Sequence, residues 1–186
     1  MKHLNYFNII KLTIMIDIKK IIQESEIKAG DRVADFGAGS GFIATEIAKT
    51  VGEKGELIAI DILAEPLEVI ESKSKHLGLM NIRTIKSDLE KENGSTLEAN
   101  STDAIMISNL LFQIERPEII IKEAERISKQ GGKIIAVEWL PEKMVSQGGN
   151  FSHSPQEIKK LFEGHGLNFV KEFVPGPNHY GLIYQK

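Results

Sequence analysis

The sequence predicts an α/β fold in which a mainly parallel sheet is covered by helices on both faces. The first observation is that short apolar segments alternate with helical segments from residue 32 onward, a pattern typical of strand–helix–strand crossovers. The second is that the last two apolar segments are joined by a short loop around residues 175–178, which makes an antiparallel hairpin. The last strand is therefore expected to run against the others. The 186 residues correspond to about one domain.

The first half of the chain opens with a helix, expected over residues 17–28. Asp17 is its N-cap, and isoleucines follow at helical spacing. Gly52 and Gly78 end two further helices. The expected elements after the first helix are a strand at 32–36, a helix at 42–51, a strand at 56–60, a helix at 63–77 and a strand at 81–86.

The second half continues the alternation after a polar loop at residues 90–102. Pro117 stands at the start of one helix, and Ser154 and Glu157 form a capping-box pattern at the start of another. The expected elements are a strand at 103–108, a helix at 116–129, a turn at 130–132, a strand at 133–138, a helix at 155–163, and strands at 167–173 and 180–184.

Composition restricts the partners and excludes one group of chemistries. The chain has 23 Lys and Arg against 26 Asp and Glu, a net charge of −3, whereas nucleic-acid binders usually carry a basic stripe. A nucleic-acid partner is therefore disfavoured. The chain has no cysteine, which excludes disulfides, thiolate metal sites and thiol nucleophiles, and no metal site is expected.

The N-terminal segment is apolar over residues 4–18, but polar residues interrupt it. A bilayer span needs about 20 apolar residues, and no small-residue cleavage site follows, so neither a membrane span nor a signal peptide is expected. We expect an N-terminal extension over residues 1–16, one domain over residues 17–186, and a cytoplasmic location.

The strongest motif is a glycine-rich turn between the first strand and the following helix. Asp35 stands near the end of that strand, and glycines occupy every second position from Gly37 to Gly41. Glycine lets the backbone turn sharply and lets a ligand approach without a Cβ in the way. The helix N-terminus that follows presents free N–H groups to a group such as a carboxylate. The motif indicates a ligand site at this strand end.

Two cofactor classes use such a turn, and the residues around it favour one of them. A dinucleotide fingerprint needs a further glycine where this chain has Phe42. A pyrophosphate is also disfavoured beside the carboxylate of Asp35, whereas that carboxylate can balance the ammonium of S-adenosylmethionine. The motif therefore predicts S-adenosylmethionine rather than NAD.

Two further acidic residues follow later strands. Asp61 closes the second strand, where a carboxylate can accept both hydroxyls of an adenosine ribose. Asp88 follows the third strand, where a carboxylate can accept from an adenine amino group while Ile62 or Leu89 packs against the ring. A helix cap and a turn cap are the alternative interpretations of these two carboxylates.

Together these segments resemble the class I S-adenosylmethionine-dependent methyltransferases. The resemblance rests on residues 33–44, 103–114 and 131–138 with Asp61 and Asp88, and it extends from about residue 18 to residue 186. It implies a Rossmann-like, doubly wound sheet of seven strands with the last one reversed. The segment 123–133 is similar to the branch that methylates quinones and other small molecules. The implied cofactor-binding residues are Asp35, Gly37, Ala38, Gly39, Gly41, Phe42, Asp61, Ile62, Asp88, Leu89, Asn109 and Leu110.

Departures from other branches favour a small-molecule acceptor. Residues 108–111 differ from the Asn/Asp-Pro-Pro-Tyr motif of adenine- and glutamine-directed enzymes, and arsenic methylation relies on cysteines that this chain lacks. No large insertion separates the fifth strand from the last helix. The acceptor site is therefore open, or is completed by the N-terminal segment or by a second subunit, which leaves a homodimer open.

His153 and Glu138 are the candidates for a general base. Both are expected at the carboxyl edge of the sheet, together with Trp139. A solvated histidine and a surface carboxylate are the alternative interpretations. Two other functions stay open: a non-catalytic S-adenosylmethionine-binding protein or partner subunit of the same fold, and an NAD-dependent oxidoreductase, against which Asp35 and Phe42 argue.

Overall fold

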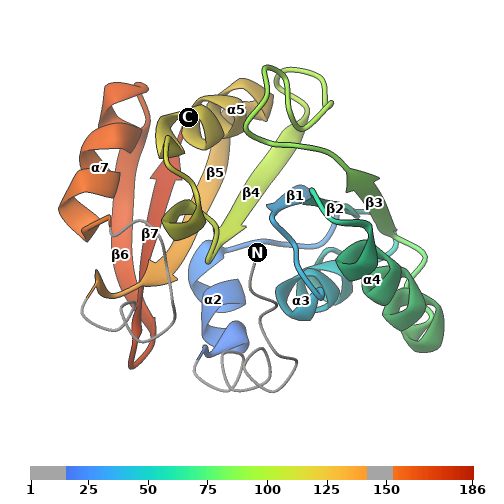
Figure 1. Cartoon of the computed structure of the whole chain (residues 1–186). Coiled ribbons are helices and arrows are strands. Elements are labelled where there is room, and N and C mark those ends of the chain that lie inside the picture. The colour runs from blue at the N-terminus through green and yellow to red at the C-terminus, as the bar shows by residue number, and fades with distance from the viewer. Residues whose placement is uncertain (1–15, 142–152) are drawn as a thin grey trace.

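The computed structural model describes residues 16–141 and 153–186, which form one seven-stranded sheet with helices on both faces. The strand order is β3-β2-β1-β4-β5-β7-β6, running from right to left across Figure 1. The strands are β1 (Arg32–Phe36), β2 (Glu56–Asp61), β3 (Ile82–Lys86), β4 (Thr102–Ser108), β5 (Ser128–Trp139), β6 (Asn168–Gly176) and β7 (His179–Gln185). The helices are α2 (Ile18–Ser25), α3 (Phe42–Val51), α4 (Ala64–Leu77), α5 (Pro117–Ile127) and α7 (Pro155–Gly164), with a short 3₁₀ helix η1 (Leu111–Gln113).

The sheet has the predicted direction of its strands. β7 runs antiparallel to both of its neighbours, β5 and β6, while β1 to β5 pair in parallel. The mainly parallel sheet and the reversed last strand are therefore confirmed. The order changes direction at the centre, where β1 pairs with β2 on one side and with β4 on the other. Such a point opens a crevice at the carboxyl ends of the strands.

Apolar layers on the two faces hold the helices to the sheet, because successive side chains of a strand point to opposite faces. On one face, α2 and α3 pack Ile21 and Ile47 in one cluster with Val33 of β1, and α4 packs against β2 and β3. On the other face, α5 and α7 contribute Ile120 and Phe162 to a second cluster. Burial from both sides explains the near-continuous apolar runs of the central strands.

The caps expected from the sequence are present at two helices. The side chain of Asp17 accepts the N–H of Lys20 (3.0 Å) at the start of α2. At α7, the hydroxyl of Ser154 accepts the N–H of Glu157 (3.2 Å), and the carboxylate of Glu157 accepts the N–H of Ser154 (2.7 Å). Both the N-cap and the capping box are confirmed.

Two helices end earlier than the sequence predicts. The first helix ends at Ser25, because Glu26 adopts a left-handed backbone conformation (φ 54°) that closes it. The helix expected over residues 116–129 ends at Ile127, because Ser128 already pairs with β4 and begins β5. The turn expected next is instead an irregularity inside β5, where the register with β4 shifts.

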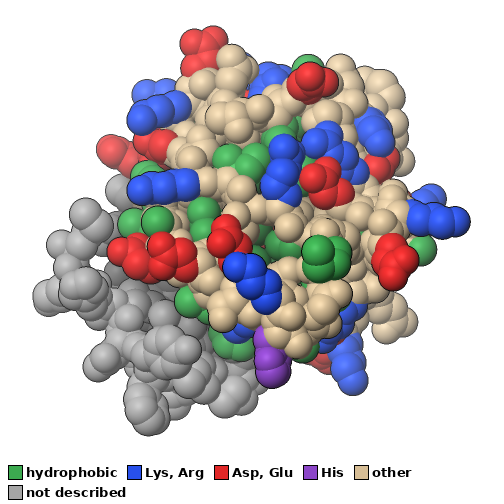
Figure 2. Space-filling model, turned by 90° about the vertical axis from the view of Figure 1, so that its right-hand side faces the viewer, with side chains coloured by type: hydrophobic (Ala, Val, Ile, Leu, Met, Phe, Trp, Pro, Cys, Tyr) green, Lys and Arg blue, Asp and Glu red, His purple; other side chains and the backbone are tan. Residues whose placement is uncertain are grey.

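The face on the side of β3 and α4 carries acidic and basic side chains interspersed with one another (Figure 2). Arg32 and Arg83 both form ion pairs with Glu56, at 2.7 and 3.3 Å. The described residues of this face therefore show no stripe of one charge. Within the two described ranges, the structure contains no helix with the length and apolar character that a membrane crossing requires.

Candidate functional site

A cavity of about 470 Å³ lies at the carboxyl ends of β1 and β4, where the strand order changes direction. Small-molecule sites typically have volumes of roughly 300–1,000 Å³. The glycine turn, the starts of α3 and α4 and the turn after β4 form its walls. Seven of the twelve residues expected to bind a cofactor line it, namely Asp35, Gly37, Ala38, Gly39, Gly41, Phe42 and Asn109.

Hydrogen bonds to neighbouring elements hold the glycine turn. The N–H groups of Gly37 and Ala38 both donate to the carbonyl of Ile60 in β2, at 2.8 and 3.0 Å. From α4, the ammonium of Lys73 donates to the carbonyl of Ser40 (2.7 Å). The turn is thus tied to two elements that follow it in the chain.

The glycines of the turn serve different purposes. Gly41 has a left-handed backbone (φ 74°), and a Cβ added there would lie 2.4 Å from Cγ1 of Ile70. This glycine lets α3 approach α4 closely. At Gly39 (φ 50°), an added Cβ would meet no atom nearer than 4.0 Å, so the space beside this residue is open to a ligand.

Asp35 brings a buried carboxylate to the cavity wall. The residue is 3% exposed, and no residue of the described ranges donates a hydrogen bond to its side chain. Burial, assisted by the negative charge of Asp61, raises the pKa of Asp35 to about 7. Burial without a partner disfavours the charged form of a carboxyl group. The site is therefore suited to a cationic group, which would favour the charged form again.

Asp61 connects β2 to the glycine turn. Its Oδ2 accepts the N–H of Gly39 (2.9 Å), and its Oδ1 accepts the N–H of Leu63 (3.0 Å) just before α4. Both oxygens keep a further lone pair for a ligand hydroxyl. The structure thus adds a positioning role at the turn, and the ribose interpretation stays a prediction.

The three residues expected around an adenine lie outside the cavity wall. Ile62 is 55% exposed beside Asp61, so its side chain is accessible to a planar ring. Asp88 accepts the N–H of Glu90 (3.0 Å), and Leu89 is buried in the core. Their roles toward a cofactor stay predictions.

Asn109 and Leu110 form the turn that follows β4. Asn109 has a left-handed backbone (φ 52°), and its Oδ1 is buried without a hydrogen-bond partner among the residues that the structure describes. Leu110 packs against the glycine turn, since a Cβ added at Gly37 would lie 3.0 Å from Cδ1 of Leu110. The two turns therefore contact each other across the crevice.

Glu138 lies near the end of β5 and is buried, unlike a surface carboxylate. Its Oε1 accepts the N–H groups of Leu110 (3.0 Å) and Leu111 (2.8 Å). Burial raises the pKa of Glu138 to about 8, although the N–H groups of the turn act in the opposite direction. Its Oε2 is buried and has no partner in the described part of the chain.

His153 lies just before α7 and close to the cavity without lining it. Its Nε2 is 3.3 Å from the carbonyl oxygen of Ile114, the residue that follows Gln113 of the cavity wall. The residues just before it, 142–152, lie outside the described residues. A role for His153 as a base stays a prediction.

Trp139 is buried beside β7. Its ring lies against that of His179, with centroids 4.0 Å apart, and Trp139 Nε1 and both nitrogens of His179 have no partner within the described ranges. Burial lowers the pKa of His179 to about 4. Neither ring is part of the cavity wall.

Sequence reasoning missed much of the apolar wall. Ile16 precedes α2, Ile18 is its first residue, and Phe112 lies in η1. The apolar N-terminal segment was the available signal for the first two, whereas Phe112 carries no local signal. The missed lining residues are Ile16, Ile18, Ser40, Ile43, Glu65, Pro66, Val69, Ser108, Phe112 and Gln113.

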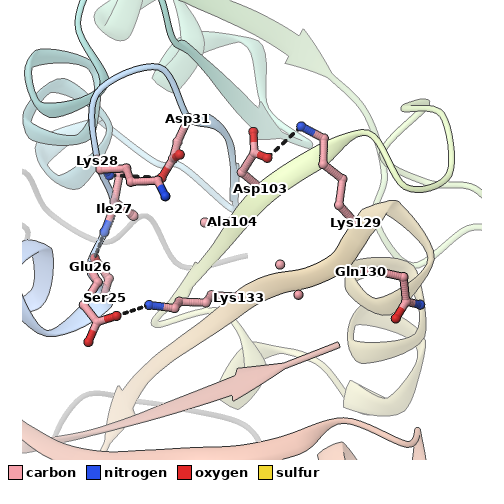
Figure 3. Close-up of a pocket in the computed structure, with 12 residues that line it drawn as sticks. Ser25, Glu26, Ile27, Lys28, Asp31, Asp103, Ala104, Lys129, Gln130 and Lys133 are labelled. Carbon is pink, nitrogen blue, oxygen red and sulfur yellow. Dashed lines mark hydrogen bonds and ion pairs between the residues drawn. The ribbon is translucent and has the colours of Figure 1, made fainter.

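A second cavity, of about 230 Å³, lies at the opposite edge, near the amino end of β4 (Figure 3). Four of its charged side chains form two ion pairs, Lys129 with Asp103 at 2.6 Å and Lys133 with Glu26. Because these side chains already have partners of opposite charge, they are less available to bind a charged ligand. The cavity at the carboxyl edge is therefore the candidate site.

The residues of the carboxyl-edge cavity fit S-adenosylmethionine. The carboxylate of Asp35, to which no described residue donates, matches an ammonium group, and the open space at Gly39 allows a ligand to approach the backbone. The Oδ1 of Asn109 is buried without a partner in residues 16–141 and 153–186, so this acceptor remains for a ligand donor.

Comparisons with known proteins point in the same direction. Residues 27–169 match a family model described as a methyltransferase domain. The chain is 34% identical over 121 residues to the ubiquinone/menaquinone biosynthesis C-methyltransferase UbiE of Bdellovibrio bacteriovorus, a match that covers 65% of this chain and 49% of that protein. It is 32% identical over 111 residues to the protein-L-isoaspartate O-methyltransferase of Methanococcus aeolicus, covering 60% and 47%.

A solved structure agrees over nearly the whole chain. The crystal structure of a SAM-dependent methyltransferase from Aquifex aeolicus superimposes with a TM-score of 0.80 at 26% identity, covering 91% of this chain and 89% of that one. The chain spans about half the length of the two curated relatives that it matches.

Proposed function

Because the chain belongs to the class I S-adenosylmethionine-dependent methyltransferase family, with S-adenosylmethionine as its cofactor, we propose that it transfers a methyl group to a small organic acceptor. The observation that carries the proposal is the buried carboxylate of Asp35, which has no hydrogen-bond donor among the described residues, beside the open glycine turn. A quinone-type ring is the acceptor class that the UbiE relative favours.

When bound, S-adenosylmethionine supplies a methyl group on a positively charged sulfur. The chain contributes binding and orientation: Asp35 would pair with the ammonium, and Asp61 would accept the ribose hydroxyls from a position fixed by Gly39. Orientation of the acceptor and exclusion of water then lower the barrier of an in-line displacement.

The acceptor class is supported by the character of the cavity wall. Ile16, Ile18 and Phe112 give it an apolar side, and acidic and basic groups are sparse there. An uncharged ring or chain would bury apolar surface against these residues, at roughly 25 cal/mol per Å². The N-terminal residues of the domain would thereby complete the acceptor site.

His153 is the proposed base for acceptors that must lose a proton. A hydrogen bond to the carbonyl of Ile114 requires the proton on Nε2, which leaves Nδ1 as the basic nitrogen. Only the neutral imidazole can accept a proton from the acceptor.

Calorimetry with S-adenosylmethionine, S-adenosylhomocysteine and NAD tests the proposal first. We expect binding of the first two and none of NAD; binding of NAD alone would contradict the cofactor assignment. Transfer of a labelled methyl group is then measured over a panel of quinols, phenols, amines and an isoaspartyl peptide. Binding without transfer to any of them would favour the non-catalytic alternative, and transfer to the peptide alone would contradict a small-molecule acceptor.

His153→Ala tests the base once an acceptor is known. The rate of single-turnover transfer should fall by roughly 10²–10⁴-fold while cofactor affinity is unchanged. A normal rate would exclude His153 as the base.

A further inference from the structure

We infer that Glu138 is a positioning residue of the cofactor site: it fixes the turn that carries Asn109 into the cavity wall. This inference rests on the proposed function, because it treats the carboxyl-edge cavity as the cofactor site. It gives Glu138 a role different from that of a general base.

Two adjacent residues of β5 bind three successive N–H groups of the turn after β4. The carbonyl of Val137 accepts the N–H of Asn109 (2.9 Å), and Oε1 of Glu138 accepts the N–H groups of Leu110 (3.0 Å) and Leu111 (2.8 Å). The backbone of β5 can reach the first of these donors, because Ser108 is the last residue paired with it. A side-chain acceptor is needed for the next two, and Glu138 supplies it.

Glu138 is itself rigidly held. Its neighbour Val137 pairs with β4, and Glu138 pairs with Tyr180 of β7, so strands lie on both sides of it. The residue is buried, which strengthens its hydrogen bonds and makes an unpaired N–H in this place costly.

The turn leaves β4 at Asn109, whose backbone is left-handed with a φ of 52°, a conformation that asparagine adopts more readily than most residues other than glycine. Its carbonyl accepts the side-chain amide of Gln113 (2.6 Å). With its backbone held on both sides, Asn109 stays in the cavity wall, and its buried Oδ1 has no partner within the part of the chain that the structure describes.

The same contacts argue against proton transfer by Glu138. Its Oε1 is engaged by the two N–H groups, its Oε2 is buried, and the residue is not part of the cavity wall. A group in this position acts on the cofactor through Asn109.

Three variants test the inference. Glu138→Gln keeps an oxygen acceptor, Glu138→Asp shortens the side chain by one methylene, and Glu138→Leu removes the acceptor. Glu123→Leu is the matched control, because Glu123 is also buried and accepts a backbone N–H, that of Ser95 (2.9 Å) in the loop before β4, but is not part of the cavity wall.

The first readout is amide hydrogen exchange of Leu110 and Leu111 in the ligand-free protein. We expect wild-type protection in Glu138→Gln and in the control, and exchange at least tenfold faster in Glu138→Leu. If Glu138→Leu does not fold, Glu138→Asp should show the faster exchange. Equal protection in all folded Glu138 variants would overturn the inference, even if the protein bound no cofactor.

The second readout is the affinity for S-adenosylmethionine, with Asn109→Ala combined in a double-mutant cycle. Glu138→Leu should weaken binding about tenfold, Glu138→Gln less than about twofold, and the losses of Glu138→Leu and Asn109→Ala should not add. Additive losses, or wild-type affinity in Glu138→Leu, would overturn the inference. Absence of binding to the wild-type protein would contradict the proposed function instead.

Discussion

Replacing Asp35 with Asn should stabilise the free protein and weaken cofactor binding at the same time. The carboxylate is buried, lacks a donor within the described ranges, and has a pKa raised to about 7 by burial and by Asp61. In an unfolded chain the pKa of an Asp is about 3.9. The native state therefore binds more protons than the unfolded state between about pH 4 and pH 7, and its stability falls as the pH rises through this window.

The size of the effect follows from the difference between a pKa of about 7 in the native state and about 3.9 in the unfolded chain, which corresponds to about 4 kcal/mol. Asn is neutral at every pH, so the variant escapes a destabilisation of about 4 kcal/mol above pH 7 and gains almost nothing below pH 4. Binding changes in the opposite direction, because the ammonium of the cofactor loses a charged partner. A charge-assisted hydrogen bond contributes about 1.5–3 kcal/mol, which is roughly a ten- to hundredfold loss of affinity.

Urea denaturation at pH 5 and pH 8, with calorimetry of S-adenosylmethionine binding at pH 8, measures both effects. Asp103→Asn is the control, since burial acts to raise the pKa of Asp103 but Lys129 and the N–H of Arg32 hold it below its usual range. That variant should lose stability at neutral pH and keep its affinity. If Asp35→Asn is less stable than wild type at pH 8, or binds the cofactor equally well, the reasoning is refuted.

Three further predictions concern the turn and its supports. Gly41→Ala should cost about 2–4 kcal/mol of unfolding free energy, because the added Cβ would lie 2.4 Å from Ile70 on a left-handed backbone. Gly39→Ala should cost about 1 kcal/mol and mainly weaken cofactor binding, because the space beside Gly39 is open. Equal losses of stability in the two variants would contradict this difference between the glycines. Glu138→Gln should be more stable than wild type at pH 9, and this advantage should be smaller at pH 5. The reason is that Glu138 has a pKa of about 8, so the wild-type protein loses stability as the pH rises from about 4.5 to 8. Thermal melts at the two pH values measure the difference. Asp61→Ala should lower cofactor affinity at least tenfold in calorimetry, because it removes the acceptor for the N–H of Gly39 and for the ribose hydroxyls. Unchanged affinity would place the ribose elsewhere.

Local patterns in the sequence were sufficient for most of the fold. The seven strands, the reversed last strand and the capping box at Ser154 are all confirmed, because each depends on periodicity, loop length or residues within one helical turn. The predicted end of α5 at residue 129 was wrong: this helix ends at Ile127, because Ser128 pairs with Thr102, a residue distant in the chain.

The candidate site also has one part that contiguous sequence predicts and another part that only the fold brings together. The sequence by itself determined the glycine turn and the placement of Asp35 beside it, because strand, turn and helix N-terminus are contiguous and their residues must lie together. The tertiary structure decided which distant residues complete the cavity, such as Ile16 and Phe112, and that Glu138 is buried against the turn after β4. It also decided the protonation properties of Asp35 and Glu138. The physical reason is that desolvation and hydrogen bonding depend on what surrounds a carboxyl group in space, and residues far apart in the sequence supply those surroundings.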